Sequence, residues 1–290
     1  MQNRILVAGS GWLGTTLARK FASAGDEVWA LRRSRDALAR LQNEGIRPFP
    51  ADLGEPALLK DLPPVDILIY CAAPAGPGID AYRKIYVEGL KHVLAAYAGR
   101  LPRRLVFTSS TGVYGFTDGR WVDENSSAEP LDEEGRVLLE AERQAQRAGP
   151  EPYIIRLGGL YGPRRHRLAQ LLDGSLEIHG ADRYVNLLHR DDAVNIIRFL
   201  LEKGNSGAVY LGVDGHPATR RELYTWLAAE RGVSPPKFLE PELDEPRGSG
   251  KRCRSVKLEA LGFTFRYPTF KEGYRALFTD GGRRDFSITE

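Results

Sequence analysis

Three glycines near the start of the chain form a pattern that can bind a phosphate group. The residues Gly9-Ser10-Gly11-Trp12-Leu13-Gly14 follow a strand-like run, Arg4–Ala8, and precede a segment with apolar residues at helical spacing. In that context the first glycine permits a tight turn, the second lets backbone approach a pyrophosphate, and the third allows close helix–strand packing. The N–H groups of the first helical turn would point at the anion. The pattern therefore predicts that these six residues bind a dinucleotide, and a glycine-rich turn without a ligand is the alternative.

The end of the second expected strand indicates which dinucleotide is bound. An NAD site usually places Asp or Glu there, which accepts hydrogen bonds from the ribose 2′-hydroxyl. This chain has Arg32, Arg33 and Ser34 at that point, while Asp26 and Glu27 precede the strand. Arginine binds a phosphate through paired charge-assisted hydrogen bonds, which suits the 2′-phosphate of NADP(H). The sequence favours NADP(H) over NAD(H), with solvated surface charge as the alternative interpretation of the arginines.

The composition excludes several classes of protein. The 290 residues include 41 Lys and Arg and 38 Asp and Glu, and the net charge of +3 gives no reason to expect nucleic acid or a membrane surface as a partner. The only cysteines, Cys71 and Cys253, form neither a disulfide framework nor a zinc site, and no metal is expected. The longest apolar run, residues 67–73, is far shorter than the roughly 18 residues that span a bilayer.

A strand-like run so close to Met1 leaves no room for a signal peptide. We therefore expect a soluble, cytoplasmic protein whose partner is a small-molecule substrate and which exists as a monomer or a homodimer.

Strand-like and helix-like segments alternate along most of the chain, which is the pattern of βαβ units in a parallel sheet. The expected strands cover residues 4–8, 28–31, 47–50, 66–73, 104–109, 153–157 and 208–213. A helix is expected directly after the glycine pattern, and further helices over residues 80–98, 132–148, 190–202 and 219–231. Residues 164–182 are predicted to be rich in loops, and residues 234–250 form an excursion rich in proline and glutamate.

This alternation predicts an α/β fold, a Rossmann-like doubly wound parallel sheet with a smaller C-terminal substrate lobe. Residues 1–163 are expected to form the dinucleotide-binding domain, with 184–215 returning to it. Residues 164–183 and 216–290 are expected to form the smaller lobe.

Several further motifs occur at the ends of the expected strands. Ala51-Asp52-Leu53 follows the third, Tyr70-Cys71-Ala72-Ala73-Pro74 ends the fourth, residues 107–115 end the fifth, and residues 156–163 follow the sixth. Together with residues 184–193, these motifs resemble the extended short-chain dehydrogenase/reductase family, also called the NAD-dependent epimerase/dehydratase family. The resemblance covers residues 4 to about 215. The Gly-Trp-Leu-Gly element also resembles that of an atypical bacterial subgroup of the family.

The resemblance implies a role for each matching position. Asp52 and Leu53 would bracket the adenine, and Ala72, Ala73 and Pro74 would line the ribose side of the cofactor. Thr108 and Ser109 would lie beside the nicotinamide, with Leu157, Gly158 and Leu160 on its other side. Ser110 matches the catalytic Ser/Thr that hydrogen-bonds the substrate carbonyl or hydroxyl. A polar strand end whose hydroxyls cap local backbone is the alternative for these hydroxyl residues.

One departure from the family concerns proton transfer. Members use a Tyr-x-x-x-Lys pair on the helix after the fifth strand, because a phenol that titrates near about pH 10 needs an ammonium neighbour to work near neutral pH. The matching positions here are Glu134 and Leu138, and Tyr86 replaces the family's usual Asn. The only Tyr-x-x-x-Lys in the chain runs from Tyr267 to Lys271 and lies far beyond the sheet.

Three side chains could supply the missing acid. Tyr114 lies four residues past Ser110, although the sequence places no lysine to activate it. Glu134 could act as a carboxylic acid if desolvated, but the helix dipole near its position favours the ionised form. His166 titrates in a suitable range and lies among three arginines that would bind a substrate phosphate or carboxylate, with an ordinary surface loop as the alternative. We assign Ser110 and Tyr114 to catalysis and Arg165 and His166 to the substrate, and we regard His189 as structural.

The sequence thus predicts an NADP(H)-dependent oxidoreductase or epimerase that acts on a small polar or sugar-like carbonyl compound. Ser110 would polarise the carbonyl, hydride would pass at the nicotinamide C4, and Tyr114 or ordered water would handle the proton. A non-catalytic NADP(H)-binding sensor or scaffold is one alternative. An isomerase or dehydratase with tightly held cofactor is another.

Overall fold

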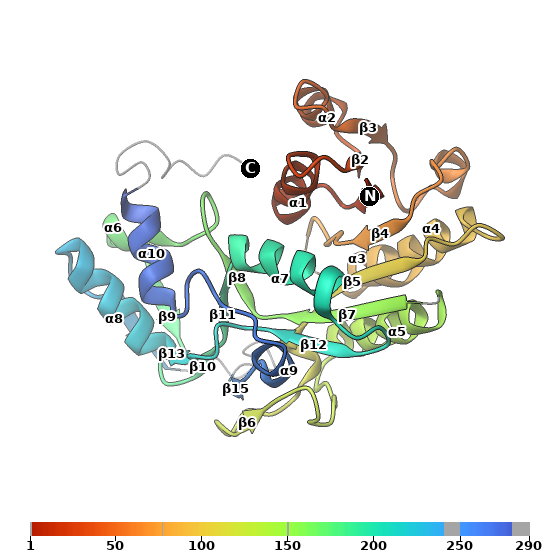
Figure 1. The fold of residues 1–290 in the computed structure, drawn as a ribbon. Coiled ribbons are helices and arrows are strands. Elements are labelled where there is room, and N and C mark those ends of the chain that lie inside the picture. Colours follow the sequence, from red (N-terminus) through yellow and green to blue (C-terminus); the bar gives the residue numbers. More distant parts are fainter. Residues whose placement is uncertain (1, 77, 150, 241–249, 280–290) are drawn as a thin grey trace. The chain divides into compact units, whose positions relative to one another are not determined.

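Seven strands form the main sheet, in the order β12-β7-β5-β4-β1-β2-β3 (Figure 1). They are β1 (Arg4–Ala8), β2 (Glu27–Arg32), β3 (Arg47–Pro50), β4 (Ile67–Tyr70), β5 (Arg104–Ser110), β7 (Glu151–Leu157) and β12 (Val209–Gly212). The pairs from β3 through β5 run parallel, with β1 between β2 and β4. The strand order reverses at β1, as in doubly wound sheets. The predicted Rossmann-like α/β fold is therefore confirmed.

The computed structural model describes residues 2–76, 78–149, 151–240 and 250–279. The chain divides into two compact units, of which the first comprises residues 1–113, 132–156 and 194–210 and the second the remaining segments, 114–131, 157–193 and 211–290. The domain boundaries expected from the sequence stay a prediction, because compactness alone does not say what each part binds.

The central strands are apolar because both faces of the sheet are covered. Residues 5–8 of β1 are fully buried, and β4, with the sequence Ile-Leu-Ile-Tyr, is buried throughout. Such continuous apolar runs are typical of parallel strands with helices on both sides. In Figure 1, α4 (Leu90–Ala96) and α5 (Glu133–Arg147) lie behind the sheet, and α7 (Arg190–Lys203) lies in front.

One helix precedes β2 and another follows it. The first, α1 (Trp12–Ala22), begins inside the glycine pattern and buries Leu13, Leu17 and Phe21. The second, α2 (Arg35–Gln42), was not expected from the sequence, and the Ser34 hydroxyl caps it by accepting a hydrogen bond from the N–H of Ala37 at 3.4 Å. Its eight residues contribute only two buried leucines, which left little periodic signal.

The helix expected over 80–98 is interrupted by a π-helical segment. It starts as α3 (Ile79–Tyr82), widens over Arg83–Gly89 and continues as α4. The Tyr70 hydroxyl of β4 donates a hydrogen bond to the carbonyl of Ile85 at 2.5 Å, and a Cβ on Gly89 would lie 2.7 Å from that hydroxyl oxygen. A side chain inserted among helical carbonyls is a known cause of such bulges.

A buried ion pair joins α5 to the sheet within the first unit. The Arg156 guanidinium of β7 donates to Glu142 of α5, with Nη2–Oε2 2.7 Å and Nε–Oε1 3.0 Å. The side chains are only 8% and 4% exposed. Two parallel hydrogen bonds satisfy both charges, which fixes the orientation of α5 on the sheet.

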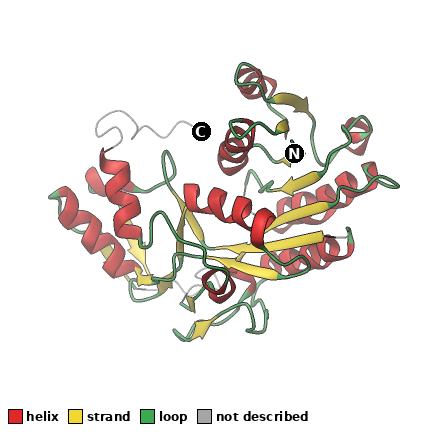
Figure 2. Ribbon diagram, viewed as in Figure 1, coloured by secondary structure: helices red, strands yellow, loops and turns green. Residues whose placement is uncertain are grey.

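The second unit is built from short elements. Its described strands form four two-stranded pairs: β8 (Gly159–Tyr161) with β11 (Leu187–His189), β9 (Glu177–His179) with β14 (Lys237–Leu239), β10 (Tyr184–Val185) with β13 (Ala218–Thr219), and β6 (Trp121–Val122) with β15 (Arg252–Cys253). Its helices are α6 (Leu168–Leu172), α8 (Arg220–Arg231), α9 (Val256–Ala260) and α10 (Phe270–Thr279) (Figure 2). Strands of two or three residues carry too little alternation to be recognised from sequence. A capping box of Thr219 and Glu222 begins α8, and Gly232, with φ +65°, ends it.

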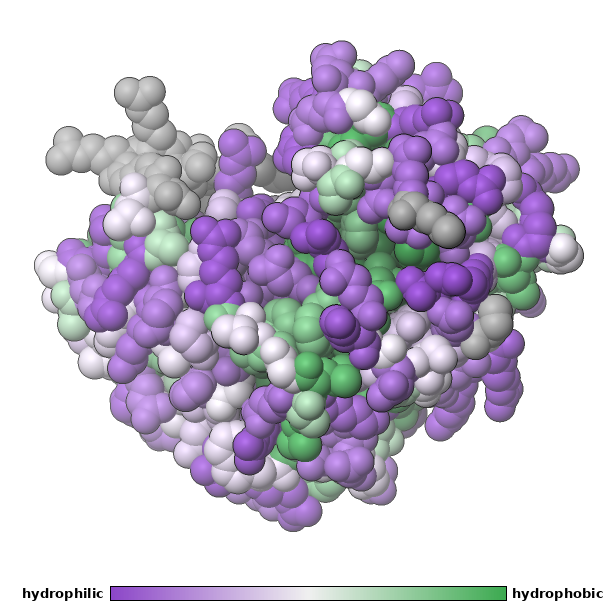
Figure 3. All heavy atoms as spheres, viewed as in Figure 1, coloured by the Kyte–Doolittle hydropathy of each residue, from purple (hydrophilic) through white to green (hydrophobic). Residues whose placement is uncertain are grey.

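Hydrophilic residues cover most of the face drawn in Figure 3. Among the described residues, no helix combines the length and the apolar character needed to cross a membrane.

Candidate functional site

The glycine turn between β1 and α1 is held by backbone contacts that only glycine permits. Gly9 has φ +97°, and a Cβ there would lie 2.3 Å from both the Cα and the N of Ala72. A Cβ on Gly14 would lie 2.4 Å from the carbonyl oxygen of Gly9. The N–H groups of Gly9 and Ser10 both donate to the carbonyl of Leu31, at 3.1 and 3.0 Å. Two of the three glycines are thus required by the packing of the turn itself.

Gly11 is different, because its neighbourhood is open. It is exposed, and a Cβ there would meet only the Gly9 carbonyl oxygen, at 3.9 Å. It is also the N-cap of α1, where it has no side chain to accept the N–H groups of a first turn that carries no acidic residue. An open backbone at a helix N-terminus fits an anion such as a pyrophosphate.

The other residues of the pattern have inward or partly covered side chains. Ser10 is fully buried and its hydroxyl donates to the Val7 carbonyl at 3.0 Å. Leu13 is buried and Trp12 half-buried. For Ser10 and Leu13, contact with a cofactor would therefore involve backbone rather than side chain.

The ends of β2 and β3 bring Arg33 and Asp52 together. Their closest atoms, Nη1 and Oδ2, are 3.8 Å apart, and Arg33 is 67% exposed. The other Asp52 oxygen, Oδ1, accepts a hydrogen bond from the N–H of Gly54 at 2.8 Å. Arg32 is half-buried, and Ser34 faces the start of α2 as its cap. Leu53 packs in the hydrophobic core, so its expected contact with adenine stays a prediction.

The ends of β4 and β5 carry the small and hydroxyl residues expected around the cofactor. Ala72 is buried, Ala73 exposed and Pro74 half-buried. The Thr108 hydroxyl donates to the Tyr70 carbonyl at 3.4 Å. Ser109 is 7% exposed, and its hydroxyl has no hydrogen-bond partner among the described residues. An unpaired buried hydroxyl is costly, and a bound polar group would satisfy it.

Ser110 follows at the end of β5. It is half-buried, and its Oγ accepts a hydrogen bond from the N–H of Gly112 at 3.0 Å. Because the oxygen is the acceptor in this contact, the hydroxyl proton can be donated to another group.

The first turns of α5 hold the positions at which the family resemblance expects the proton-transfer pair. Glu134 is half-buried, Leu138 is 4% exposed, and α5 contains neither tyrosine nor lysine. Burial raises the pKa of Tyr82, and the charge of Glu134 adds to that shift. Tyr86 packs its ring against Tyr82 and Phe107, with centroid distances of 5.4 and 6.3 Å.

In the second unit, Gly158 lies against Asn186. A Cβ on Gly158 would lie 2.6 Å from the Asn186 carbonyl oxygen, and the N–H of Gly158 donates to Gly212 at 2.9 Å. Leu157 is buried and Leu160 half-buried. Tyr114 is fully buried and belongs to this unit, whereas Ser110 belongs to the first unit.

The second unit contains a basic cavity of about 740 Å³. Its lining includes Arg164, Arg165, His166, Arg167, His179, Arg220 and Tyr224, together with Leu160, Ile178 and Leu223. The structure thus brings Arg165 and His166 together, as the sequence expected. It adds Arg220 and Tyr224 from α8, which lie more than 50 residues further along the chain and gave no sequence signal.

A strained turn presents the first arginines to this cavity. The N–H of Arg165 donates to the Gly162 carbonyl at 3.0 Å, and Arg164 has φ +63°. Pro163 and Arg164 occupy the central positions, where a positive φ is normally left to glycine. Strain of this kind concentrates at binding and catalytic sites.

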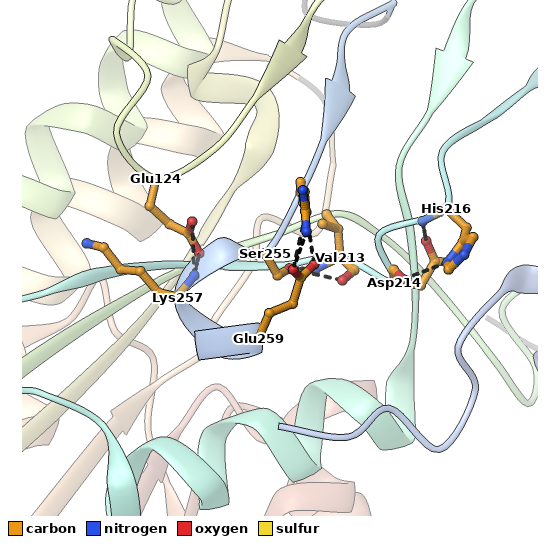
Figure 4. Close-up of polar contacts among 8 residues, drawn as sticks. Glu124, Val213, Asp214, His216, Ser255, Lys257 and Glu259 are labelled. Carbon is orange, nitrogen blue, oxygen red and sulfur yellow. Dashed lines mark hydrogen bonds and ion pairs between the residues drawn. The ribbon is translucent and has the colours of Figure 1, made fainter. Parts of the chain in front are cut away.

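Beside the cavity, three polar atoms are buried without a hydrogen-bond partner among the described residues. They are the Tyr161 hydroxyl, His189 Nε2 and Asp214 Oδ2. The Tyr161 and His189 rings lie edge to face at 5.2 Å, and Asp214 uses its other oxygen to accept the N–H of His216 at 3.0 Å (Figure 4). Burial lowers the pKa of His189 to about 4, which favours the neutral imidazole near neutral pH, and the structural role expected for this residue stays a prediction.

We expect Asp214→Asn to flatten the pH dependence of stability. Burial raises the pKa of Asp214 to about 8, and the carboxylates of Asp192 and Glu272 add to the shift. An unfolded aspartate releases its proton near about pH 4. Between these values the native state binds more protons, so the free energy of unfolding falls as the pH rises, by up to about 1.4 kcal/mol per pH unit.

Urea unfolding of wild type and Asp214→Asn at several pH values measures this difference. Parallel stability curves would show that Asp214 is ionised in the folded protein.

Among the described residues, no group of three or more His, Cys, Asp or Glu side chains is arranged to hold a metal ion.

The chain matches known proteins over most of its length. Residues 5–211 match the model of the NAD dependent epimerase/dehydratase family. Protein YeeZ of Escherichia coli (strain K12) is 33% identical over 276 residues, which cover 91% of this chain and 96% of YeeZ. The sterol-4-alpha-carboxylate 3-dehydrogenase, decarboxylating, of Dictyostelium discoideum is 26% identical over 82% of this chain and 79% of that protein. The structure of a conserved protein of unknown function from Silicibacter pomeroyi DSS is 26% identical, with a TM-score of 0.80, and covers 96% of this chain and 99% of that one. This chain belongs to the NAD-dependent epimerase/dehydratase family.

Proposed function

We propose that this protein is an NADP(H)-dependent oxidoreductase or epimerase that acts on a small polar or sugar-like carbonyl compound with an anionic group. The observation that carries the proposal is the open backbone of Gly11 at the N-terminus of α1, between two glycines that the packing requires. The unpaired hydroxyl of Ser109 at the end of β5 supports a bound polar group in the same unit. The related sterol dehydrogenase is an oxidoreductase by name, which agrees with this class of reaction.

The preference for NADP(H) is proposed from the residues that follow β2. Arg32 ends β2 and Arg33 follows it, at the place where a Rossmann-type site contacts the adenosine ribose. The first turn of α2 is already capped by Ser34 and carries Asp36, so the arginines rather than the helix would bind the phosphate. Arg33 is highly exposed, and its Nη1 lies 3.8 Å from Asp52 Oδ2. An exposed pair at that distance is weak. A 2′-phosphate would compete well for such a guanidinium.

Arg32→Ala and Arg33→Ala should each weaken NADPH binding about 10- to 150-fold, since a hydrogen bond to a charged group is worth about 1.5–3 kcal/mol. The affinity for NADH should not change. Calorimetric titration of both dinucleotides measures the two affinities, with Arg40→Ala, an exposed arginine at the other end of α2, as the control. Equal losses for NADPH and NADH would contradict a 2′-phosphate contact.

The residues proposed for the chemistry are Ser110 and Tyr114. When bound, the dinucleotide supplies or accepts hydride at its nicotinamide C4. The Ser110 hydroxyl, whose oxygen already accepts a hydrogen bond from the Gly112 N–H, donates a hydrogen bond to the substrate carbonyl oxygen and polarises that bond. Tyr114 gives the proton that the oxygen takes up.

The anionic group of the substrate is proposed to occupy the basic cavity. The lining contains four arginines and one acidic residue, Glu177, so the cavity favours negative charge; the arginines are Arg164, Arg165, Arg167 and Arg220. Its volume of about 740 Å³ lies within the usual range for small-molecule sites.

NADPH oxidation against a panel of carbonyl compounds tests the proposed activity. Matched pairs of phosphorylated and neutral compounds should show turnover mainly with the phosphorylated member. If NADPH binds tightly and no compound is reduced, the enzymatic proposal fails.

A second function is favoured by one observation, the absence of tyrosine and lysine from α5. We propose that the chain is an atypical member of its family, of the Gly-Trp-Leu-Gly subgroup, without the usual proton-transfer pair. As a sensor or scaffold it would bind NADP(H) without turnover and change its oligomeric state or partner binding. Light scattering with and without NADPH distinguishes this function from catalysis.

A further inference from the structure

Lys251 is buried in a way that sets it apart from every other lysine. The chain has nine lysines, all in the described part, and Lys251, at 1% exposure, is the only one of them that is buried. Burying an ammonium group is costly, and lysine is almost never fully buried without a compensating role. Lys251 therefore calls for a physical explanation.

The backbone around Lys251 is clamped by Asn186. The Asn186 side chain donates to the Lys251 carbonyl at 3.0 Å and accepts from the N–H of Cys253 at 2.6 Å. The intervening Arg252 points outward, where its guanidinium lies over the rings of Trp121 and Tyr184 at 5.0 and 5.1 Å. Side chains alternate along an extended segment, so Lys251 and Cys253 point inward.

The same asparagine connects Lys251 to the segment proposed to cover the nicotinamide. The Asn186 carbonyl accepts the N–H of Gly159 at 2.7 Å and lies against Gly158. One residue thus contacts both the backbone of Lys251 and the backbone of Gly158, all within the second unit.

The segment that follows Tyr114 lies beside the residues that flank Lys251. A Cβ on Gly250 would be 2.7 Å from the carbonyl oxygen of Thr117, three residues after Tyr114. The pairing of β15 with β6 continues this alignment, with the N–H of Arg252 donating to Arg120 at 2.9 Å. Tyr114, like Lys251, is fully buried. Two neighbouring segments therefore each contribute a buried side chain, the phenol of Tyr114, which can give up a proton, and the ammonium of Lys251, which can stabilise the resulting phenolate.

Glu124 is a buried acid that, like Lys251, acts on Cys253. Its carboxylate accepts the N–H groups of Leu211 at 3.0 Å and of Lys257 at 3.3 Å, at the start of α9 (Figure 4). Burial raises the pKa of the Cys253 thiol to about 12. The charge of Lys251 opposes this shift and the charge of Glu124 adds to it, so both charges act on Cys253. A purely structural Lys251 would serve as the counter-charge of Glu124, and the test below separates that role from proton transfer.

We propose that Lys251 supplies the ammonium group that α5 does not provide, and that it acts with Tyr114 as the proton-transfer pair of the site. The inference rests on the proposed function. An ammonium near a phenol stabilises the phenolate. In reduction, hydride from NADPH adds to the carbonyl carbon, Tyr114 protonates the oxygen to give the alcohol, NADPH becomes NADP⁺, and solvent returns a proton to the phenolate. Lys251 acts through Tyr114 and is a positioning residue.

The ionisation of tyrosine in the protein without substrate tests the pair directly. Ultraviolet difference titration of wild type should show one tyrosine that ionises about 1–3 pH units below the others. Tyr114→Phe should remove that step. Lys251→Met should move it upward into the main transition, and Lys251→Arg should restore it in part. Lys257→Met, which removes a lysine from the same region, should leave it unchanged.

The outcomes separate this inference from the proposed function. If wild type shows no early tyrosine, or if Lys251→Met retains it, the pair is refuted even where NADPH turnover is observed. Since wild type and Tyr114→Phe already decide whether the early step exists, the test survives a Lys251→Met variant that does not fold. Where turnover is measurable, Lys251→Met should lower kcat, shift the basic limb of its pH profile upward and leave the NADPH affinity unchanged.

Discussion

Gly11→Ala should weaken dinucleotide binding at least about 100-fold, or roughly 2.7 kcal/mol, with little change in Tm. The methyl group would project into the open space beside the turn, where, apart from its chain neighbours and its own helix, the Gly9 carbonyl oxygen at 3.9 Å is the only described atom within 4 Å. Folding is therefore unaffected, but the backbone can no longer approach a pyrophosphate. Calorimetric titration with NADPH and thermal unfolding measure the two effects separately.

Gly9→Ala is the matched contrast within the same pattern. Its methyl group would lie 2.3 Å from the Ala72 backbone at a residue with φ +97°, so the turn itself must deform. We expect a clear loss of Tm there. Normal NADPH affinity in a well-folded Gly11→Ala protein would show that no pyrophosphate lies on this turn.

Ser110→Ala should lower kcat by about 10²–10³, the usual cost of removing one donor to a developing oxyanion. The hydroxyl oxygen accepts the Gly112 N–H, and only its proton is available to the substrate. NADPH affinity should stay within about twofold, because the proposed contact forms with the carbonyl and strengthens as charge develops. Steady-state kinetics with the best substrate of the carbonyl panel provides the measurement.

Thr111→Val is the control for this substitution, since it removes the adjacent hydroxyl with little change in shape. A Ser110→Ala enzyme with undiminished kcat would reduce Ser110 to a local cap of the Gly112 backbone. A loss of stability without a loss of kcat would lead to the same conclusion.

Much of the first unit could be predicted from local sequence. β1 lies over the predicted residues 4–8, and β4 and β5 fall within or close to the predicted ranges. Buried parallel strands are short apolar runs, and a glycine turn between strand and helix is specified by adjacent residues, so both leave a signal that needs no distant partner. The π-helical segment after α3 left none, because it depends on a tyrosine from β4.

The sequence by itself determined the sheet, the glycine turn, the arginines after β2 and the lack of tyrosine and lysine in α5. Only the tertiary structure decided which side chains line the proposed substrate cavity and which lie near the proposed proton donor. It placed Arg220 in one cavity with Arg165, and it buried Lys251 beside the segment that follows Tyr114. These neighbours are separated by more than 50 residues and joined by two-residue strands and single side chains such as Asn186. Sequence periodicity indicates only which face of a continuous helix or strand is buried. Contacts between residues on distant short segments therefore cannot be predicted from it and require the folded structure.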